Sequence, residues 1–191
     1  YMVPTALRLA RRHATYVPDL PGFGKSARPH RVLDVPGLAD ALASWLGTAR
    51  LARAAFLGNS LGCQVIVDLA FRYPETVSRA VLVGPTLDPR ARSLTRQLLR
   101  AARDLFNESP SLWPIVLRDY LSARPLRTLR TLRYTFADPL EEKLPRLRAP
   151  TLVVRGERDP LTPRRWADEL TRLVPHARLV VLPHGSHAAN Y

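Results

Sequence analysis

The sequence is short of several residue types, and each shortage excludes a class of protein. Cys63 is the one cysteine in the 191 residues, so no disulfide can form within the chain. Aromatic residues make up 7% and no nucleic-acid-binding motif occurs, so we expect no specific nucleic-acid partner. No apolar run approaches the roughly 18 residues that a membrane-spanning helix needs. We therefore expect a globular chain in a reducing compartment, the cytoplasm.

Acidic residues are also scarce beside basic ones. The chain has 29 basic and 16 acidic residues, and its formal net charge is +13. Lys25 and Lys143 are the only lysines, so the excess is arginine. The arginines occur in every segment and are densest from Arg90 to Arg133. We interpret them as a solvated surface. Binding to heparin that falls steeply with salt would instead favour a nucleic-acid binder.

The hydropathy pattern predicts an α/β fold with a mostly parallel sheet. Apolar runs of strand character alternate with amphipathic helical stretches, which is typical of βαβ units. We expect strands at about Ala14–Pro18, Ala54–Leu57, Arg79–Val83, Pro150–Arg155 and Leu179–Leu182. We expect helices near Gly37–Leu46, from the turn at Gly58–Gly62 to about Tyr73, and near Pro163–Leu173.

The alternation stops in the middle of the chain. From about Asp88 to Leu144 the sequence predicts several helices and no clear strand, and strand patterning returns at Thr151. We therefore predict a helical insertion in an α/β core. The expected division is residues 1–87 and 145–191 for the two parts of the core and residues 88–144 for the insertion.

A G-x-S-x-G motif lies where the second expected strand meets a helix. The apolar strand runs into Gly58, and a helical pattern begins directly after Gly62. In this strand–turn–helix context the motif predicts a nucleophile elbow with Ser60 as the nucleophile. The tight turn favours residues without a β-carbon at Gly58 and Gly62. The backbone N–H of Leu61, at the start of the helix, is suited to stabilising an oxyanion. A glycine turn with an idle serine is the alternative.

A serine nucleophile needs a general base, and the chain offers five histidines. We predict His187, which follows the last expected strand, where active sites of such sheets gather. His184 lies in the same loop and is the main competitor. Gly185 and Ser186 form a turn that favours presentation of the residue after it. The five histidines are His13, His30, His176, His184 and His187.

The expected orienting acid is Asp159. A strand ends at Gly156, and Asp159 lies in the loop before the next helix, so the order is serine, acid, histidine. A carboxylate there can bond the second imidazole nitrogen and fix the tautomer. The alternative role is a turn cap, which Asp before Pro160 often provides. Glu157 and Asp88 are the reserve candidates.

Four ordered motifs resemble the α/β-hydrolase fold serine hydrolases. Asp19–Ser26 is similar to their D-x-P-G-x-G-x-S loop, and Gly58–Gly62 to their elbow. Gly156–Pro163 is similar to their acid loop, and Gly185–His187 to their histidine loop. The resemblance implies an enzyme that acts on an ester, lactone, amide or related carbonyl of a small molecule through an acyl-enzyme. It implies no cofactor and no metal, and it implies that the helical insertion is a lid.

The resemblance also implies alternative functions for the same fold. Asn59 in the elbow resembles carbon–carbon bond hydrolases of the family, and an acyltransferase would use the same triad. A ligand-binding or inactive form of the fold is the other alternative. The family's H-G loop with a second oxyanion N–H, its first strands and its last helix have no counterpart here. We therefore expect a fragment truncated at both ends, which by itself could be inactive.

Overall fold

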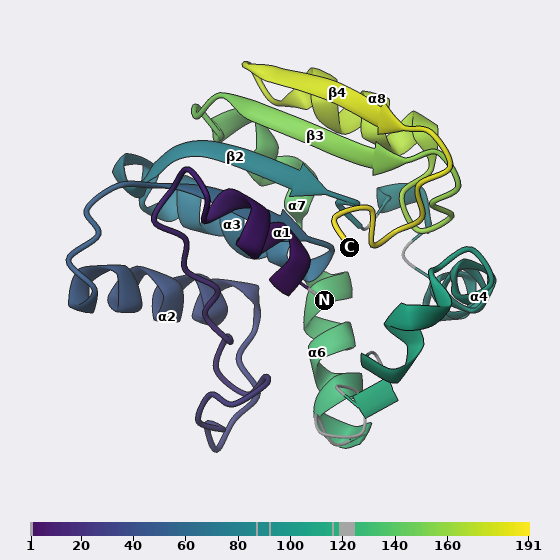
Figure 1. Cartoon of the computed structure of the whole chain (residues 1–191), viewed down its shortest axis with the longest axis horizontal. Coiled ribbons are helices and arrows are strands. Elements are labelled where there is room, and N and C mark those ends of the chain that lie inside the picture. The colour runs from purple at the N-terminus through teal and green to yellow at the C-terminus, as the bar shows by residue number, and fades with distance from the viewer. Residues whose placement is uncertain (1, 87, 92, 116, 119–124) are drawn as a thin grey trace.

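The computed structural model describes residues 2–86, 88–91, 93–115, 117–118 and 125–191, and its centre is a parallel sheet. The four strands pair in sequence order, each parallel to the next, and Figure 1 shows β2, β3 and β4 side by side. Because parallel strands end at the same edge of a sheet, the loops that follow them lie close together. The strands are β1 (Ala54–Asn59), β2 (Val77–Val83), β3 (Thr151–Gly156) and β4 (Ala177–Leu182).

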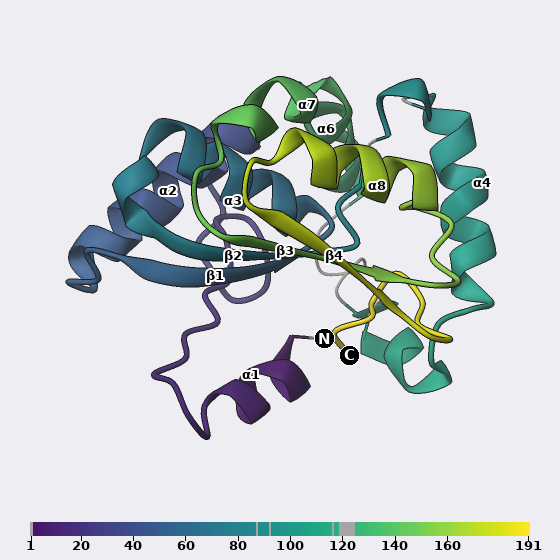
Figure 2. The same cartoon turned by 90° about the horizontal axis from the view of Figure 1, so that it is seen from above.

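Helices cover one face of this sheet. Connections between parallel strands must cross over the sheet, and each crossover here carries a helix. Figure 2 shows these helices on one side and the N-terminal helix on the other. The first group includes α2 (Val35–Thr48), α3 (Leu61–Arg72), η1 (Pro74–Thr76) and α8 (Arg164–Leu173), and the N-terminal helix is α1 (Val3–Leu9). Thr5 and Asn190 are hydrogen-bonded, so the two ends of the chain lie side by side.

The described residues of the segment between β2 and β3 form helices joined by turns and irregular stretches, and they include no strand. Its helix α4 lies beyond the carboxyl ends of the strands in both views (Figures 1 and 2). The segment contains η2 (Pro89–Ala91), α4 (Leu94–Leu105), η3 (Pro110–Leu112), α6 (Pro125–Ala137), α7 (Leu140–Lys143) and η4 (Leu144–Arg146).

The core forms between the sheet and the helices that cover it. Helix α2 begins where the Asp34 side chain accepts a 2.9 Å hydrogen bond from the Gly37 N–H, a typical N-cap. Its buried residues recur at helical spacing and pack against α3. Trp166 of α8 is fully buried, and its indole nitrogen donates to the Pro85 carbonyl at 3.1 Å. The buried residues of α2 are Val35, Leu38, Ala39, Leu42 and Leu46.

A buried cluster of charged groups joins α7 to α3. The Lys143 ammonium lies 2.5 Å from a carboxylate oxygen of Asp68 and also bonds Asp138. All three side chains are at most 10% exposed. Burial alone would lower the pKa of Lys143, but the hydrogen bonds and charges of both carboxylates raise it. A buried carboxylate requires such a partner, so the three groups depend on one another.

The predicted strand at Ala14–Pro18 is wrong. These residues form an irregular segment, and the sheet contains no strand before β1. Tyr16 and Val17 are 56% and 50% exposed, and the Tyr16 ring meets the ring of Trp45 of α2 edge-on at 5.8 Å. Their composition favours a strand, but they pair with none in this structure.

Among the described residues, no helix combines the length and apolarity needed to cross a bilayer.

Candidate active site

Ser60 occupies a strained turn between β1 and α3. Its φ is 53° and its ψ is −118°, a conformation that is rare for a residue with a side chain. The Ser60 N–H donates to the Val83 carbonyl of the next strand at 3.1 Å, which helps to hold the turn. A β-carbon on Gly58 would lie 2.7 Å from the Gly62 backbone, so Gly58 must be glycine.

The expectation for Gly62 is wrong. A β-carbon there would meet nothing within 4 Å, and its φ is not in the left-handed region. The close approach in the turn is made by Gly58 to the backbone of Gly62, so only the first glycine of the motif is required by space. Leu61 is the first residue of α3, where no earlier helical turn accepts from its N–H. That N–H is therefore available to a negatively charged oxygen at the helix N-terminus.

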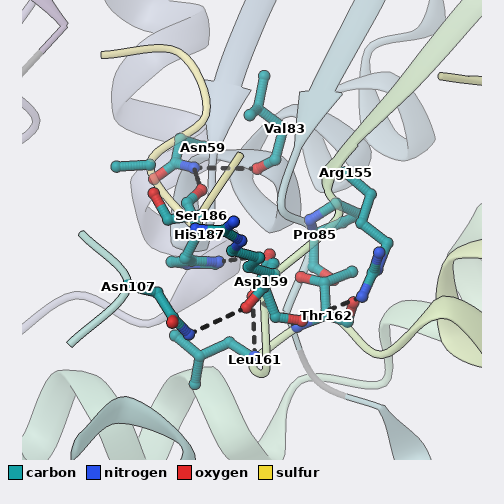
Figure 3. Close-up of polar contacts among 12 residues, drawn as sticks. Asn59, Val83, Pro85, Asn107, Arg155, Asp159, Leu161, Thr162, Ser186 and His187 are labelled. Atoms are coloured by element: carbon teal, nitrogen blue, oxygen red, sulfur yellow. Dashed lines mark hydrogen bonds and ion pairs between the residues drawn. The ribbon is translucent and has the colours of Figure 1, made fainter. Parts of the chain in front are cut away.

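Asp159 and His187 are brought together across the carboxyl edge of the sheet. His187 Nδ1 lies 2.9 Å from Asp159 Oδ2, although the residues are 28 positions apart (Figure 3). The other oxygen, Oδ1, accepts from the backbone N–H groups of Leu161 at 2.8 Å and Thr162 at 3.0 Å. Asp159 is 1% exposed and His187 is 9% exposed. The carboxylate is thus fully occupied and presents one fixed oxygen to the imidazole.

Both groups have perturbed pKa values. Burial alone would raise the pKa of Asp159, but the hydrogen bond and charge of His187 and the donors of Thr162 hold it below its ordinary value. Burial alone would lower the pKa of His187, but the hydrogen bond and charge of Asp159, with the charges of Asp104 and Glu108, raise it. The surroundings therefore favour a carboxylate beside an imidazolium.

The acid loop is held by a buried arginine of β3. Arg155 Nε donates to the Thr162 carbonyl at 2.6 Å, and its Nη2 donates to the Asp159 carbonyl at 3.3 Å (Figure 3). Arg155 is only 8% exposed. A single guanidinium thereby binds two carbonyls of the acid loop through separate N–H groups. Sequence reasoning missed this residue, which the alternating pattern of a strand does not distinguish from a surface arginine.

The histidine loop also contacts the segments after β1 and β2. The Asn59 amide donates to the Val83 carbonyl at 3.2 Å and to the His187 carbonyl at 3.0 Å, as Figure 3 shows. Gly84 has a φ of 53°, and a β-carbon there would lie 2.8 Å from His187 Nδ1. A β-carbon on Gly156 would lie 2.1 Å from the Ser186 carbonyl oxygen. Neither glycine could be assigned a role from the sequence, since each contact joins distant segments.

The competing candidates have other partners. His184 Nδ1 lies 3.2 Å from an Arg158 guanidinium nitrogen, and the His184 N–H donates to the Glu157 carboxylate at 3.0 Å. Asp88 is fully buried and forms an ion pair with Arg165. The structure therefore joins Asp159, and neither reserve acid, to the His187 ring. Within the described ranges, no three His, Cys, Asp or Glu side chains are grouped to hold a metal ion.

Comparison with known proteins identifies the family. A sequence profile described as "Alpha/beta hydrolase family" matches residues 1–191. The chain therefore belongs to the alpha/beta hydrolase family, and it is a hydrolase.

Two curated relatives carry hydrolase names. A 2-(acetamidomethylene)succinate hydrolase of Mesorhizobium japonicum is 25% identical over 212 residues, which cover 98% of this chain and 76% of that protein. A pimeloyl-[acyl-carrier protein] methyl ester esterase of Nitrosomonas europaea is 27% identical over 208 residues, covering 94% and 80%. A thermophilic esterase from Thermogutta terrifontis has a similar structure, with a TM-score of 0.77, 24% identity, and coverage of 97% of this chain and 77% of that one. That structural likeness supports the predicted α/β-hydrolase fold.

Proposed function

We propose that this hydrolase cleaves an ester, lactone, amide or related carbonyl compound through an acyl-enzyme, with Ser60, His187 and Asp159 as its triad. The observation that carries the proposal is the 2.9 Å contact between His187 Nδ1 and Asp159 Oδ2, at the sheet edge where the Ser60 turn also lies. A buried pair of this kind is the arrangement that a serine nucleophile requires.

The geometry supports a particular sequence of steps. His187 Nε2 takes the proton of the Ser60 hydroxyl while the Ser60 oxygen forms a bond to the carbonyl carbon of the substrate. The Leu61 N–H donates to the oxyanion that forms, and Asp159 stabilises the imidazolium. The imidazolium then gives its proton to the leaving group, which departs and leaves the acyl-enzyme. His187 then deprotonates a water molecule whose oxygen bonds the acyl carbon. The bond from that carbon to the Ser60 oxygen breaks, the acid leaves, and the imidazolium returns its proton to the Ser60 oxygen.

We further infer that residues 88–144 act as a lid. The described part of this segment consists of helices and their connections, and α4 lies beyond the carboxyl ends of the strands, near the loops that carry the proposed triad (Figure 1). Ligands of open α/β sheets bind at that edge. The lid would therefore border the substrate and influence which small molecules enter. A relative named as an esterase favours a carbonyl substrate of this kind.

The test is covalent labelling of Ser60 by a fluorophosphonate, in the protein expressed from its complete gene. Only an activated serine reacts quickly, so wild type should be labelled and Ser60→Ala should not. Ser60→Ala should also keep less than about a tenth of the wild-type kcat on a simple ester. The matched control is Ser44→Ala, which removes an exposed serine of α2. Equal labelling of wild type and Ser60→Ala would exclude Ser60 as the nucleophile.

The alternatives make different predictions in the same assay. An inactive ligand-binding form of the fold would leave Ser60 unlabelled. An acyltransferase or a carbon–carbon bond hydrolase would be labelled, but would hydrolyse simple esters slowly. The Asn59 amide does not further support a carbon–carbon bond hydrolase, because its two hydrogen bonds go to the carbonyls of Val83 and His187. Those bonds favour a role for Asn59 in holding the histidine loop.

A further inference from the structure

The end of helix α4 and the turn that follows it direct polar side chains inward. Asp104 is 6% exposed and Asn107 and Glu108 are partly buried, whereas Phe106 is 85% exposed. Positions 104, 107 and 108 have the i, i+3 and i+4 spacing that places side chains on one face of a helical turn. An amphipathic helix normally has the opposite distribution, with the aromatic ring inside. Because burying carboxylates is unfavourable without partners, this inverted face requires an explanation from what it contacts.

Glu108 holds the histidine loop on both sides of His187. Its Oε2 accepts a 2.7 Å hydrogen bond from the Ser186 hydroxyl, and its Oε1 accepts a 2.7 Å hydrogen bond from the Ala188 N–H. Both are short bonds to a charged acceptor, the stronger class of hydrogen bond. The carboxylate therefore bridges the two neighbours of the proposed base, about 80 positions away along the chain.

Asn107, in the turn after α4, and Asp104, near the end of α4, contact the loops that carry Asp159 and His187. The Asn107 amide donates to the Arg158 carbonyl in the acid loop at 3.2 Å. Burial raises the pKa of Asp104 to about 7, although the charge of His187 and a hydrogen bond from its backbone oppose the rise. Asp104, Asn107 and Glu108, at the end of α4 and in the turn after it, thus all contact the two loops that carry Asp159 and His187.

The loop after β4 has no regular secondary structure of its own, from Pro183 to the last residues of the chain. A general base must nevertheless keep its reacting nitrogen within hydrogen-bonding distance of the nucleophile, and a displacement of about 1 Å can cost roughly a hundredfold in rate. Asp159 fixes the ring from one side, and Asn59 fixes the His187 carbonyl. Glu108 supplies the contacts to both neighbouring residues, and it comes from the lid.

We propose that Glu108 is a positioning residue, which holds His187 in its reactive place by binding Ser186 and Ala188 from the lid side. This inference rests on the proposed function of His187 as the general base. Because Glu108 lies in the turn directly after α4, the position of His187 then depends on the position of this part of the lid. A substrate that opens the lid on entry would disturb the base until α4 returns.

The experiment compares Glu108→Ala with Glu108→Gln, in the protein expressed from its complete gene. Alanine removes both contacts. Glutamine keeps one oxygen for the Ala188 N–H and presents its NH₂ to the Ser186 hydroxyl, which can accept as well as donate. Glu75→Ala is the matched control, since Glu75 is exposed on η1. Thermal unfolding of each variant checks that it is folded.

We expect Glu108→Ala to lower kcat and the rate of fluorophosphonate labelling of Ser60 by about tenfold to a hundredfold, while KM changes by less than about threefold. Glu108→Gln should recover most of this loss, and Glu75→Ala should match wild type. The glutamine variant should also shift the acidic limb of its kcat/KM profile to lower pH, because the charge of Glu108 raises the pKa of His187.

Several results would overturn the inference. These are Glu108→Ala labelled at more than half the wild-type rate, Glu108→Gln as slow as Glu108→Ala, or an equal loss in Glu75→Ala. If Glu108→Ala does not fold, Ser186→Ala decides, because it removes one of the two contacts and should slow labelling several-fold. An unchanged rate in that variant contradicts the proposal. A wild type that is not labelled at all removes the proposed function itself, and the inference with it.

Discussion

Asp159→Asn is the substitution whose outcome the structure specifies most closely. Asparagine has the same shape as aspartate but replaces one oxygen by an NH₂ donor. Oδ1 of Asp159 accepts from the N–H groups of Leu161 and Thr162, so the oxygen of the asparagine must take that place. A flipped amide would set its NH₂ against two donors. The NH₂ therefore faces His187 Nδ1.

That arrangement puts the proton of the imidazole on the wrong nitrogen. A donor beside Nδ1 makes Nδ1 the acceptor, so Nε2 carries the hydrogen and cannot take the Ser60 proton. In a serine protease the equivalent change lowers kcat by about 10⁴-fold through the wrong tautomer, and we expect a loss of that order here. Loss of the Asp159 charge also removes the main influence that raises the pKa of His187. The acidic limb of the remaining activity should therefore move to lower pH.

The assay is kcat on a simple ester, followed across pH, together with the rate of fluorophosphonate labelling. Asp168→Asn is the matched control, because Asp168 pairs with Arg164 at the surface of α8 and such exposed pairs contribute little. A loss of less than about tenfold in Asp159→Asn would refute the tautomer argument. A large loss with an acidic limb at higher pH would refute the assigned electrostatics.

Three further predictions concern the same structure. His187→Ala should lower kcat by several powers of ten and His184→Ala by less than about tenfold, and the reverse ranking would exchange their roles. For wild type, kcat/KM should fall as the pH falls through the raised pKa of His187, since only the neutral ring accepts a proton, and a midpoint below about 6.5, the ordinary value, would contradict this. Lys143→Ala should lower the free energy of unfolding by about 3–5 kcal/mol, because it removes the ammonium that both buried carboxylates bind. Urea denaturation measures that change, and a loss below about 1 kcal/mol would show that water or another cation replaces the ammonium.

The sequence predicts the sheet and the order of its loops because both depend on local patterns. Apolar runs of strand length and glycine-containing turns identify β1 to β4 to within a few residues. The segment Ala14–Pro18 has a similar composition but pairs with no strand of the sheet, and composition carries no information about a partner. The two glycines of the elbow also look equivalent in sequence. Only the close approach of Gly58 to the Gly62 backbone separates them.

Most contacts that hold the candidate site could not be predicted, because they join segments that are distant along the chain; the bond from Arg155 to the Thr162 carbonyl is local but has no sequence motif. Ser60 is held by the carbonyl of Val83, the acid loop by Arg155, and the histidine loop by Asn59 and Glu108. The motifs name residues that carry chemistry, and these lie on loops, which have no geometry of their own without tertiary contacts. The geometry of the site must therefore come from tertiary neighbours, and of these Val83, Arg155 and Glu108 belong to none of the motifs. This is why Glu108, in a segment that the sequence marks only as helical, is a better guide to how the base is held than any residue of the histidine motif.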